Sequence, residues 1–230
     1  MKPTIRLAST TTPDGQELVL SKHDRDYYIS LSKYTLMTSR EQESELELAR
    51  LGCRRLSGRP HPQVLIGGLG MGFTLRQTLV LLPEKAKVTV AELIPEVVVW
   101  NRDYLGELTQ HPLRDPRVAV KNRDVRAVIR VAKGLYDAIL LDVDNGPSAM
   151  TMTENADLYQ PAGLQAMMQA LKEDGCLAIW SSSGDARFEK ILRREKLAYR
   201  LTRVQAAKSA KSRSRYIWLI ARTKQWLPRG

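Results

Sequence analysis

Cysteine is scarce in this chain of 230 residues: only Cys53 and Cys176 are present, far apart and each within an apolar segment. A disulfide scaffold or a cysteine-rich zinc cluster is therefore not expected, because both need several cysteines at suitable spacing. We expect two buried free thiols instead. The three histidines, His23, His61 and His111, have no Ser or Cys partner at a recognisable spacing, which argues against a hydrolase triad.

Long apolar runs are also missing. No run reaches the roughly 18 residues that a membrane-spanning helix needs, and residues 1–12 lack the apolar core of a signal peptide. We therefore expect no membrane segment and a cytoplasmic location. The hydrophobic content of 43% is enough for a full core, in one large domain or in a domain with a small appendage.

Basic residues outnumber acidic ones, 36 against 25, which gives a formal net charge of +11. Such a charge attracts polyanions such as RNA, because their binding is largely electrostatic. Much of the excess lies in residues 187–203 and in Lys208, Lys211, Arg213 and Arg215. The second group contains no aromatic residue that could stack on bases. A solvated basic loop is the simpler interpretation, and nucleic-acid binding is the alternative.

The first 39 residues predict a small antiparallel meander. Residues 12–15 form a turn signal, residues 17–21 alternate in polarity, and residues 27–31 are rich in β-forming side chains. A capping-box spacing at residues 39–42 then predicts a helix over 40–54. Gly58, Pro60 and Pro62 mark a linker. We expect a small N-terminal unit over 1–58 and a larger domain over 59–230.

From residue 63 onward, strand-like and helix-like segments alternate, which predicts an α/β, doubly wound and mainly parallel sheet. The expected strands are 64–66, 87–91, 118–121, 138–141 and 176–180. The expected helices are 73–82, 95–105, 125–132, 163–171 and 187–196. Two last strands, 198–204 and 216–221, suit an antiparallel edge hairpin, which makes seven strands in all. Ligands of such sheets bind at the carboxyl ends of the strands.

A glycine-rich loop, residues 67–72, follows the first strand of this domain and precedes a helix. Glycines let the backbone turn tightly, approach a ligand closely and present N–H groups at a helix N-terminus. Glu92 follows about 20 residues later, at the end of the next strand, where a carboxylate can accept hydrogen bonds from ribose hydroxyls. The order of strand, glycines, helix and acid predicts a nucleotide-cofactor site.

Polar residues also end the third and fourth strands of this domain. Asp124, after Asn122 and Arg123, suits either a contact with an adenine amino group or the N-cap of the following helix, and both remain open. Asp142 and Asp144 can orient a cationic amine and take its proton. The alternative is an Asx turn over residues 144–146. Asp142, Asp144 and Asn145 are hard oxygen ligands, yet no remote partner joins them, so no metal is expected.

The motifs resemble the spermidine synthase (aminopropyltransferase) family, which shares the class I S-adenosylmethionine methyltransferase fold. The likeness covers most of the chain, and its matching segments are 64–76, 90–93, 115–124, 136–142, 158–159 and 171–175. It implies a seven-stranded, Rossmann-like methyltransferase sheet preceded by a small β N-terminus. It also implies transfer of an aminopropyl group from decarboxylated S-adenosylmethionine to an amine such as putrescine, and a homodimer.

The resemblance assigns roles to individual positions. Gly68, Gly70 and Gly72 line the amino-acid side of the cofactor, Glu92 binds ribose, Asp124 lies near adenine and Asp142 lies at the reacting centre. The complete set of expected cofactor-binding residues is Gly68, Gly70, Met71, Gly72, Glu92, Leu93, Arg123, Asp124 and Asp142. The expected catalytic residues are Asp142, Asp144 and Asn145.

The chain departs from the family pattern at three places. Met71 stands where the family has an acidic residue suited to the amino end of the decarboxylated cofactor. Asn145 stands where the family has a second acid of the catalytic loop, with Asp144 as a possible substitute. Residues 160–164 replace the acidic and aromatic residues of the diamine site. A Met side chain cannot pair with an ammonium, and an Asn cannot take a proton as a carboxylate can.

Our leading hypothesis is an amine transferase that uses decarboxylated S-adenosylmethionine or S-adenosylmethionine, so that aminopropyl and methyl transfer are both open. A second hypothesis is methylation of RNA or another polyanion. Residues 145–148 lack the Asn/Asp-Pro-Pro-aromatic loop typical of amino-group methylation in nucleic acids. A third is a non-catalytic protein that keeps the nucleoside pocket.

Overall fold

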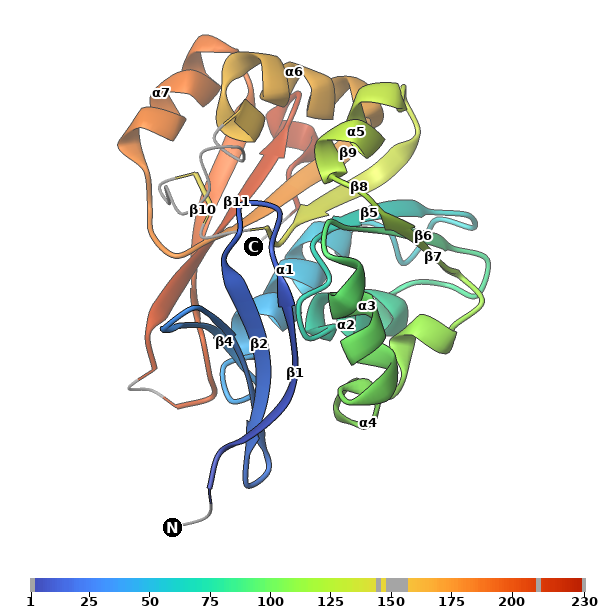
Figure 1. The fold of residues 1–230 in the computed structure, drawn as a ribbon. Coiled ribbons are helices and arrows are strands. Elements are labelled where there is room, and N and C mark those ends of the chain that lie inside the picture. Colours follow the sequence, from blue (N-terminus) through green and yellow to red (C-terminus); the bar gives the residue numbers. More distant parts are fainter. Residues whose placement is uncertain (1–2, 144–145, 148–156, 210–211, 229–230) are drawn as a thin grey trace.

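Two β-sheets make up the framework of this protein (Figure 1). The computed structural model describes residues 3–143, 146–147, 157–209 and 212–228. The smaller sheet has the order β1-β2-β3-β4 and is antiparallel throughout. Its strands are β1 (Ile5–Thr11), β2 (Glu17–His23), β3 (Asp26–Leu31) and β4 (Tyr34–Thr38). The predicted N-terminal meander is confirmed, and Gly15 N donates to the Thr12 carbonyl at 2.9 Å in the predicted turn.

The larger sheet has seven strands in the order β10-β11-β9-β8-β5-β6-β7. They are β5 (Gln63–Gly67), β6 (Lys87–Glu92), β7 (Val118–Asn122), β8 (Tyr136–Leu141), β9 (Leu171–Ser181), β10 (Ala198–Gln205) and β11 (Ser214–Ala221). Strands β5 to β9 are parallel, and β11 is antiparallel to both β9 and β10. The predicted fold class and its edge hairpin are confirmed.

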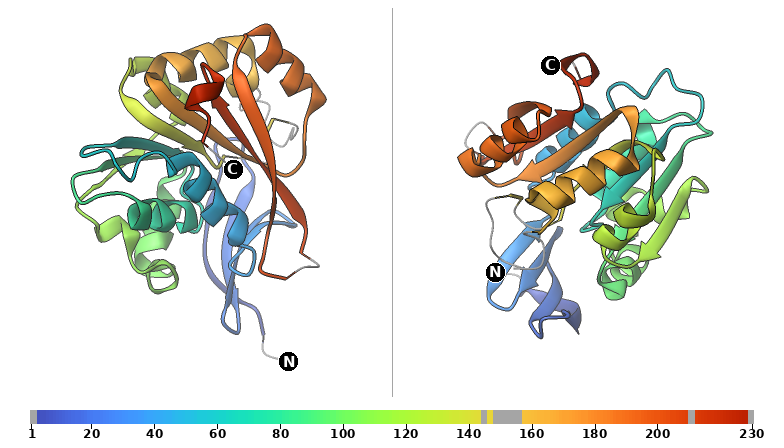
Figure 2. Two further views of the ribbon diagram at one scale, coloured as in Figure 1. Left: turned by 180° about the vertical axis from the view of Figure 1, so that it is seen from behind. Right: turned by 90° about the horizontal axis from the view of Figure 1, so that it is seen from above.

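Helices cover both faces of the larger sheet (Figures 1 and 2). Helices α5, α6 and α7 lie on one face, and α1, α2 and α3 lie on the other. The helices are α1 (Glu43–Cys53), α2 (Phe73–Leu81), α3 (Pro95–Asp103), α4 (Gly106–Thr109), α5 (Val125–Val131), α6 (Pro161–Ala170) and α7 (Ala186–Arg194). The described residues also include two short 3-10 helices, η1 (Pro112–Arg114) and η3 (Lys224–Trp226).

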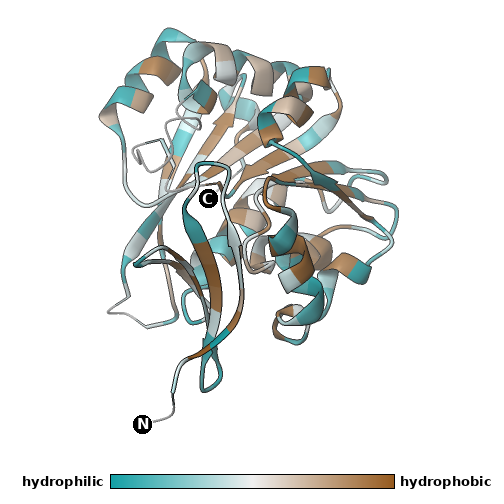
Figure 3. Ribbon diagram, in the orientation of Figure 1, coloured by the Kyte–Doolittle hydropathy of each residue, from teal (hydrophilic) through white to brown (hydrophobic). Residues whose placement is uncertain are grey.

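The central strands are apolar on both faces because both faces are covered (Figure 3). Along β5, Val64 and Ile66 belong to one hydrophobic cluster, and Leu65 belongs to the other. Residues alternate in this way because successive side chains of a strand point to opposite faces. The first cluster also includes Leu20 of β2, so the meander packs into the core beneath the larger sheet. Cys53 and Cys176 are buried free thiols, as predicted.

Three boundary predictions were wrong. The helix predicted over 40–54 begins at Glu43, and Gln42 is its N-cap without a side-chain hydrogen bond. The hydroxyl of Ser39, the expected cap, instead accepts from Tyr27 N at 3.0 Å and ties the end of the meander to β3.

The helix predicted over 95–105 ends as α3 at Asp103, and α4 follows it. Strand β9 begins at Leu171 rather than at residue 176. Leu171 pairs with Tyr136 and Cys176 with Ala138, so the intervening residues form an irregularity within one strand. The sequence prediction placed residue 171 in the preceding helix and left residues 172–175 outside the strand.

The predicted division near residue 58 stays a prediction. Helix α1 packs against α2 and against strands β8 to β11 of the larger sheet. Among the described residues, none of the helices is both long and apolar enough to cross a membrane.

Candidate active site

The glycine loop lies at the carboxyl end of β5 and has three glycines in the left-handed region. Their φ angles are 85° at Gly68, 51° at Gly70 and 89° at Gly72. A Cβ atom on Gly68 would overlap the backbone oxygen of Asp142, and one on Gly70 would lie 2.8 Å from the Met37 methyl group. The loop is therefore pressed between the end of β8 and strand β4. Only glycine allows both this conformation and this close approach.

Glu92 ends β6 beside the glycine loop, and its side chain is buried. Its Oε2 accepts from Leu69 N at 2.8 Å, and its Oε1 accepts from Ile94 N at 2.9 Å. Burial raises the pKa of Glu92, while these backbone hydrogen bonds oppose the shift. The backbone N–H groups of Leu93 and Gly70 also act on this carboxylate, so the backbone fixes it beside the loop. Leu93 follows with 39% exposure and offers an apolar surface at the same sheet edge.

Asp124 is the N-cap of α5. Its Oδ1 accepts from Arg126 N at 2.7 Å, and its Oδ2 pairs with the Arg126 guanidinium at 2.6 Å. Burial raises the pKa of Asp124, but the contacts with Arg126 outweigh it and hold the pKa below its ordinary value. The capping role is thus confirmed. The adenine contact of Asp124 stays a prediction, as does a role for the exposed Arg123.

We expect Asp124→Ala to lower the free energy of unfolding by about 1 kcal/mol, the usual cost of losing an N-cap. Asp124→Asn should restore most of that stability, because Asn also caps helices well. Urea unfolding of both variants measures the effect. The matched control is Asp185→Ala, because Asp185 caps α7 with bonds from Arg187 N and Phe188 N. If Asp124 also contacts adenine, its Ala variant alone will lose affinity for methylthioadenosine. Equal affinities of the two Ala variants would contradict that contact.

Asp142 follows β8 and is held over the glycine loop. Its backbone N–H donates to the Gly67 carbonyl at 2.9 Å, and the Thr74 hydroxyl donates to its Oδ2 at 2.8 Å. Burial raises the pKa of Asp142 to about 6, while the hydrogen bond from Thr74 opposes the shift. Asp142 is thus mostly ionised at neutral pH and close to the range in which a base works efficiently.

Thr74, in the first turn of α2, was not predicted as a site residue. Its hydroxyl is in a residue only 3% exposed, and Thr78, one turn later on the same helix face, is a second buried polar residue. That position, two residues after the last glycine, was the available signal. The structure shows that it fixes the carboxylate of Asp142.

Asp144 and Asn145 lie outside the described residues. Gly146, just after them, has a φ of 83°, and a Cβ there would lie 2.6 Å from the Ser181 side chain. The end of this loop therefore packs against the end of β9. Within the described ranges, no group of three or more His, Cys, Asp or Glu side chains is arranged to hold a metal ion.

Met71 is 1% exposed and belongs to the hydrophobic cluster beneath the sheet. Its side chain therefore packs as a core residue. The groups that remain to hold a nucleoside are the backbone N–H groups of the glycine loop and the carboxylate of Glu92. Asp142 lies beside them. Glycine N–H groups at a helix N-terminus and a carboxylate at the end of the next strand are the groups that an adenosyl compound requires, so the residues present fit one.

Glu45 is a further acidic residue near this site that sequence reasoning missed. It lies on α1, is 7% exposed, and accepts from the Ser44 hydroxyl at 2.6 Å. Burial first, and then the negative charge of Asp142, raises the pKa of Glu45 to about 8. Its spacing to Leu48, Ala49 and Gly52 places it on the buried face of the helix. That i, i+3, i+4, i+7 pattern was the signal that could have identified it.

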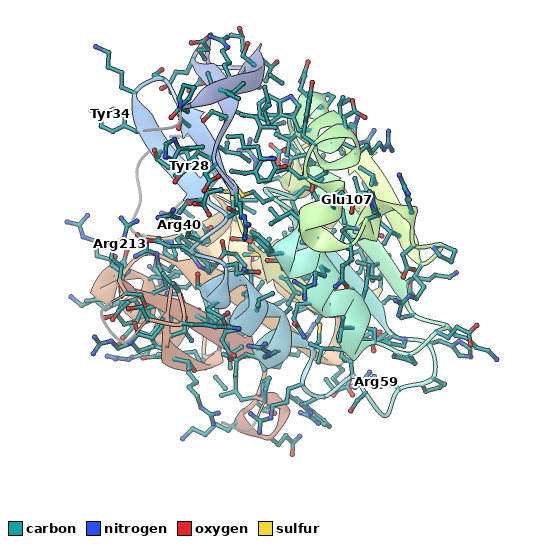
Figure 4. The ribbon with its side chains drawn as sticks, turned by 90° about the horizontal axis from the view of Figure 1, so that it is seen from below. Tyr28, Tyr34, Arg40, Arg59, Glu107 and Arg213 are labelled. Carbon is teal, nitrogen blue, oxygen red and sulfur yellow. The ribbon has the colours of Figure 1, made fainter. Side chains whose placement is uncertain are left out.

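The hairpin of β10 and β11 carries the basic residues Lys208, Arg213 and Arg215, and we call it the basic hairpin. It lies against acidic residues at the start of α1. Arg213 pairs with Glu41 at 3.0 Å, and Arg215 reaches the same carboxylate at 3.5 Å. Lys208 lies 4.0 Å from the Glu43 carboxylate. In Figure 4, Arg213 and Arg40 lie on the same side of the molecule, near the meander that carries Tyr28. These acids therefore neutralise part of the positive charge of the hairpin.

Residues 55–206 match a family model described as the spermine/spermidine synthase domain. Among curated proteins, the chain is 37% identical to polyamine aminopropyltransferase 1 of Streptomyces coelicolor over 131 residues, which are 56% of this chain and 23% of that protein. It is 31% identical to the polyamine aminopropyltransferase of Nitrosomonas europaea over 124 residues, which are 53% of this chain and 35% of that protein. The chain thus spans less than half the length of these relatives.

Solved structures resemble the whole chain. The spermidine synthase from Thermotoga maritima superposes with a TM-score of 0.74 at 22% identity and covers 95% of this chain and 73% of its own. A spermidine synthase in complex with the transition state analogue AdoDATO superposes with a TM-score of 0.75 at 20% identity, over 96% of this chain and 75% of its own. At these identities the likeness concerns the fold.

Proposed function

Because the chain belongs to the spermine/spermidine synthase family, we propose that it transfers an aminopropyl group from decarboxylated S-adenosylmethionine to a small amine. The observation that carries this proposal is the position of Asp142. Its carboxylate is held by Thr74 beside a glycine cradle, at the same sheet edge as Glu92. In this proposal, Asp142 is the base and Glu92 binds the ribose, on the two sides of the glycine loop.

The reaction needs an amine nitrogen aligned with a carbon attached to a sulfonium. In it, the nitrogen lone pair forms an N–C bond, the C–S bond breaks with its electron pair passing to sulfur, and methylthioadenosine leaves. Asp142 first attracts the acceptor as an ammonium and then takes the proton that it must lose. Holding the two reactants in line supplies much of the rate enhancement for such a displacement. The proton transfer contributes a further factor of about 10² to 10⁴.

The choice of sulfonium compound is the finer part of this proposal. Decarboxylated S-adenosylmethionine is favoured by the family, in which the curated relatives are polyamine aminopropyltransferases. Met71, buried in the core, offers no charge to the amino end of that compound. The carboxylated compound with methyl transfer is therefore the direct competitor. A small cationic amine as acceptor and a homodimer are also part of the proposal, and the cytoplasmic location stays a prediction.

Thermal unfolding with three ligands tests the nucleoside site. We expect methylthioadenosine and decarboxylated S-adenosylmethionine to raise the unfolding temperature, because a ligand that binds only the native state stabilises it by about 2.7 kcal/mol at 100 times its Kd. Glu92→Gln is the variant that should reduce the shift, since it removes the charge at the ribose position. A larger shift with S-adenosylmethionine would favour methyl transfer. If none of the three ligands shifts the unfolding temperature, both aminopropyl transfer and methyl transfer are excluded.

Turnover then tests the reaction itself. Release of methylthioadenosine from the decarboxylated compound, dependent on putrescine or another aliphatic amine, is the expected result. Methylation of RNA receives less support from the structure, because Arg213 and Arg215 of the basic hairpin pair with Glu41. Salt-sensitive RNA binding that disappears when both arginines are replaced would restore that alternative.

A further inference from the structure

Helix α1 brings a second carboxylate to the site of Asp142. The N–H of Glu43 donates to the carbonyl of Ala206 at 3.0 Å, directly after β10. Strand β10 is parallel to β8 and β9, since both β9 and β10 are antiparallel to β11. The start of α1 therefore lies at the carboxyl edge of the sheet, where Asp142 lies.

The other end of the same helix face confirms this direction. A Cβ on Gly52 would overlap the Leu140 side chain, so this part of α1 lies directly on β8. Glu45 is two turns before Gly52, about 10 Å along the helix axis. Asp142 is two residues after Leu140, about 7 Å along the strand. Both displacements point to the carboxyl edge, and they bring the carboxyl groups of Glu45 and Asp142 close together.

Three polar groups surround this pair: the guanidinium of Arg215 and the hydroxyls of Ser44 and Thr74. Arg215 of β11, with a side chain 15% exposed, lies over the Trp180 ring at 5.6 Å and pairs with Glu41. Its positive charge reaches Glu45 and opposes the rise in the pKa of Glu45. The hydroxyl groups of Ser44 and Thr74 each donate to one carboxylate of the pair. Among the described side chains, neither Glu45 nor Asp142 forms a salt bridge, and the charge of Arg215 acts on Glu45 without direct pairing.

Two carboxylates at close range, with Glu45 buried and Asp142 half-buried, cannot both ionise readily, so one proton is retained between them. Burial and mutual repulsion hold that proton on Glu45 at neutral pH, where Asp142 is ionised. A cation placed between the two groups reverses this balance, because its charge stabilises both carboxylates. An ammonium is such a cation.

We propose that Glu45 is the second carboxylate of the acceptor site, and that the Glu45–Asp142 pair gives up its shared proton when a cationic amine binds. This inference rests on the proposed function, because it assigns the amine to the site of Asp142. No bond between heavy atoms changes in this step: the O–H bond of Glu45 breaks, the proton passes to solvent, and the ammonium is held by two carboxylates. A neutral molecule of the same shape gains nothing from this pair, so the site selects for charge.

Calorimetric titration of putrescine into the protein saturated with methylthioadenosine tests this exchange. In phosphate and Tris buffers at pH 7, whose ionisation enthalpies differ, the wild type should release close to one proton per putrescine. Glu45→Gln should release almost none and should bind putrescine about tenfold more weakly or worse. Glu47→Gln is the matched control, since Glu47 lies on the same helix and pairs with Arg50. It should behave as the wild type.

The outcomes separate this inference from the proposed function. Putrescine binding and turnover by Glu45→Gln that match the wild type would overturn the role of Glu45 and leave the transferase intact. Binding by the wild type without proton release would also overturn it. Failure of methylthioadenosine to bind the wild type would instead contradict the proposed function.

The pH dependence of protein stability tests whether Glu45 and Asp142 share a proton in the absence of any ligand. A carboxyl group whose pKa is raised by folding stabilises the native state below its ordinary pKa, and this stability is lost as the pH rises through the folded pKa. For Asp142 and Glu45, with pKa values of about 6 and about 8, the loss covers the range from about pH 4 to about pH 8. Urea unfolding should therefore show Glu45→Gln gaining stability relative to the wild type between pH 5 and pH 9. A constant difference would overturn the pair.

Discussion

Replacing Asp142 by Asn is expected to lower turnover by about 10² to 10⁴, the usual contribution of a general base. An amide has almost the shape of the carboxylate but cannot take a proton. The Thr74 hydroxyl can still donate to the amide oxygen, and the bond from Asp142 N to the Gly67 carbonyl is made by the backbone. The fold and the nucleoside cradle should therefore be preserved, and the affinity for methylthioadenosine should change little.

Initial rates of methylthioadenosine release, with binding measured in parallel, check this expectation. The wild type should lose kcat/KM as the pH falls through about 6, since Asp142 must be ionised to act as a base. Thr74→Val removes the hydrogen bond that lowers the pKa of Asp142, so it should move this acidic limb to higher pH. An Asp142→Asn protein with the wild-type rate would remove Asp142 from the reaction.

Replacing Gly68 by Ala is expected to disrupt both stability and nucleoside binding. At a φ of 85°, an Ala is strained by about 1 kcal/mol or more. Its Cβ would also overlap the carbonyl oxygen of Asp142, a backbone atom that cannot rotate away. Relief requires the end of β8 to move from the glycine loop, at the cost of the bond between Asp142 N and the Gly67 carbonyl. We expect a total loss of about 3 kcal/mol or more.

The matched control for this change is Gly15→Ala in the turn of the meander. Gly15 has nearly the same φ, 83°, and a Cβ there meets no atom within 4 Å. It should lose only the strain of about 1 kcal/mol and keep its affinity for methylthioadenosine. Urea unfolding of both variants isolates the contact with Asp142. Equal losses would show that the overlap with Asp142 is relieved without cost.

The glycine loop shows which structural features the local sequence predicts and which it does not. Its order of strand, glycines, helix and acid predicted a turn at the carboxyl end of a buried strand, and the structure shows that turn with Glu92 bonded to Leu69 N. What the order could not show is why Gly68 must be glycine. The atom that excludes a side chain there belongs to Asp142, about 70 residues later in the chain.

Asp124 and Glu45 mark the two limits of sequence reasoning at this site. Asp124 was assigned two possible roles, and the contact with Arg126 N, a local one, confirmed the cap. Glu45 was not recognised, because it is one of several acids at the start of α1. The others, Glu41, Glu43 and Glu47, are half-buried and lie in salt bridges. Its significance depends on a carboxylate from β8, and no local pattern contains that information.

The sequence alone predicted the alternation of strands and helices, the seven-stranded sheet and most of the residues at its carboxyl edge. These follow from periodicity, turn residues and apolar runs, which act over a few neighbouring residues. Tertiary structure alone decided which side chains at that edge lie close together: Thr74 with Asp142, Met71 with the core, and Glu45 with the charge of Asp142. Burial and electrostatic interaction depend on distance in space, and the crossing of α1 over β8 sets that distance.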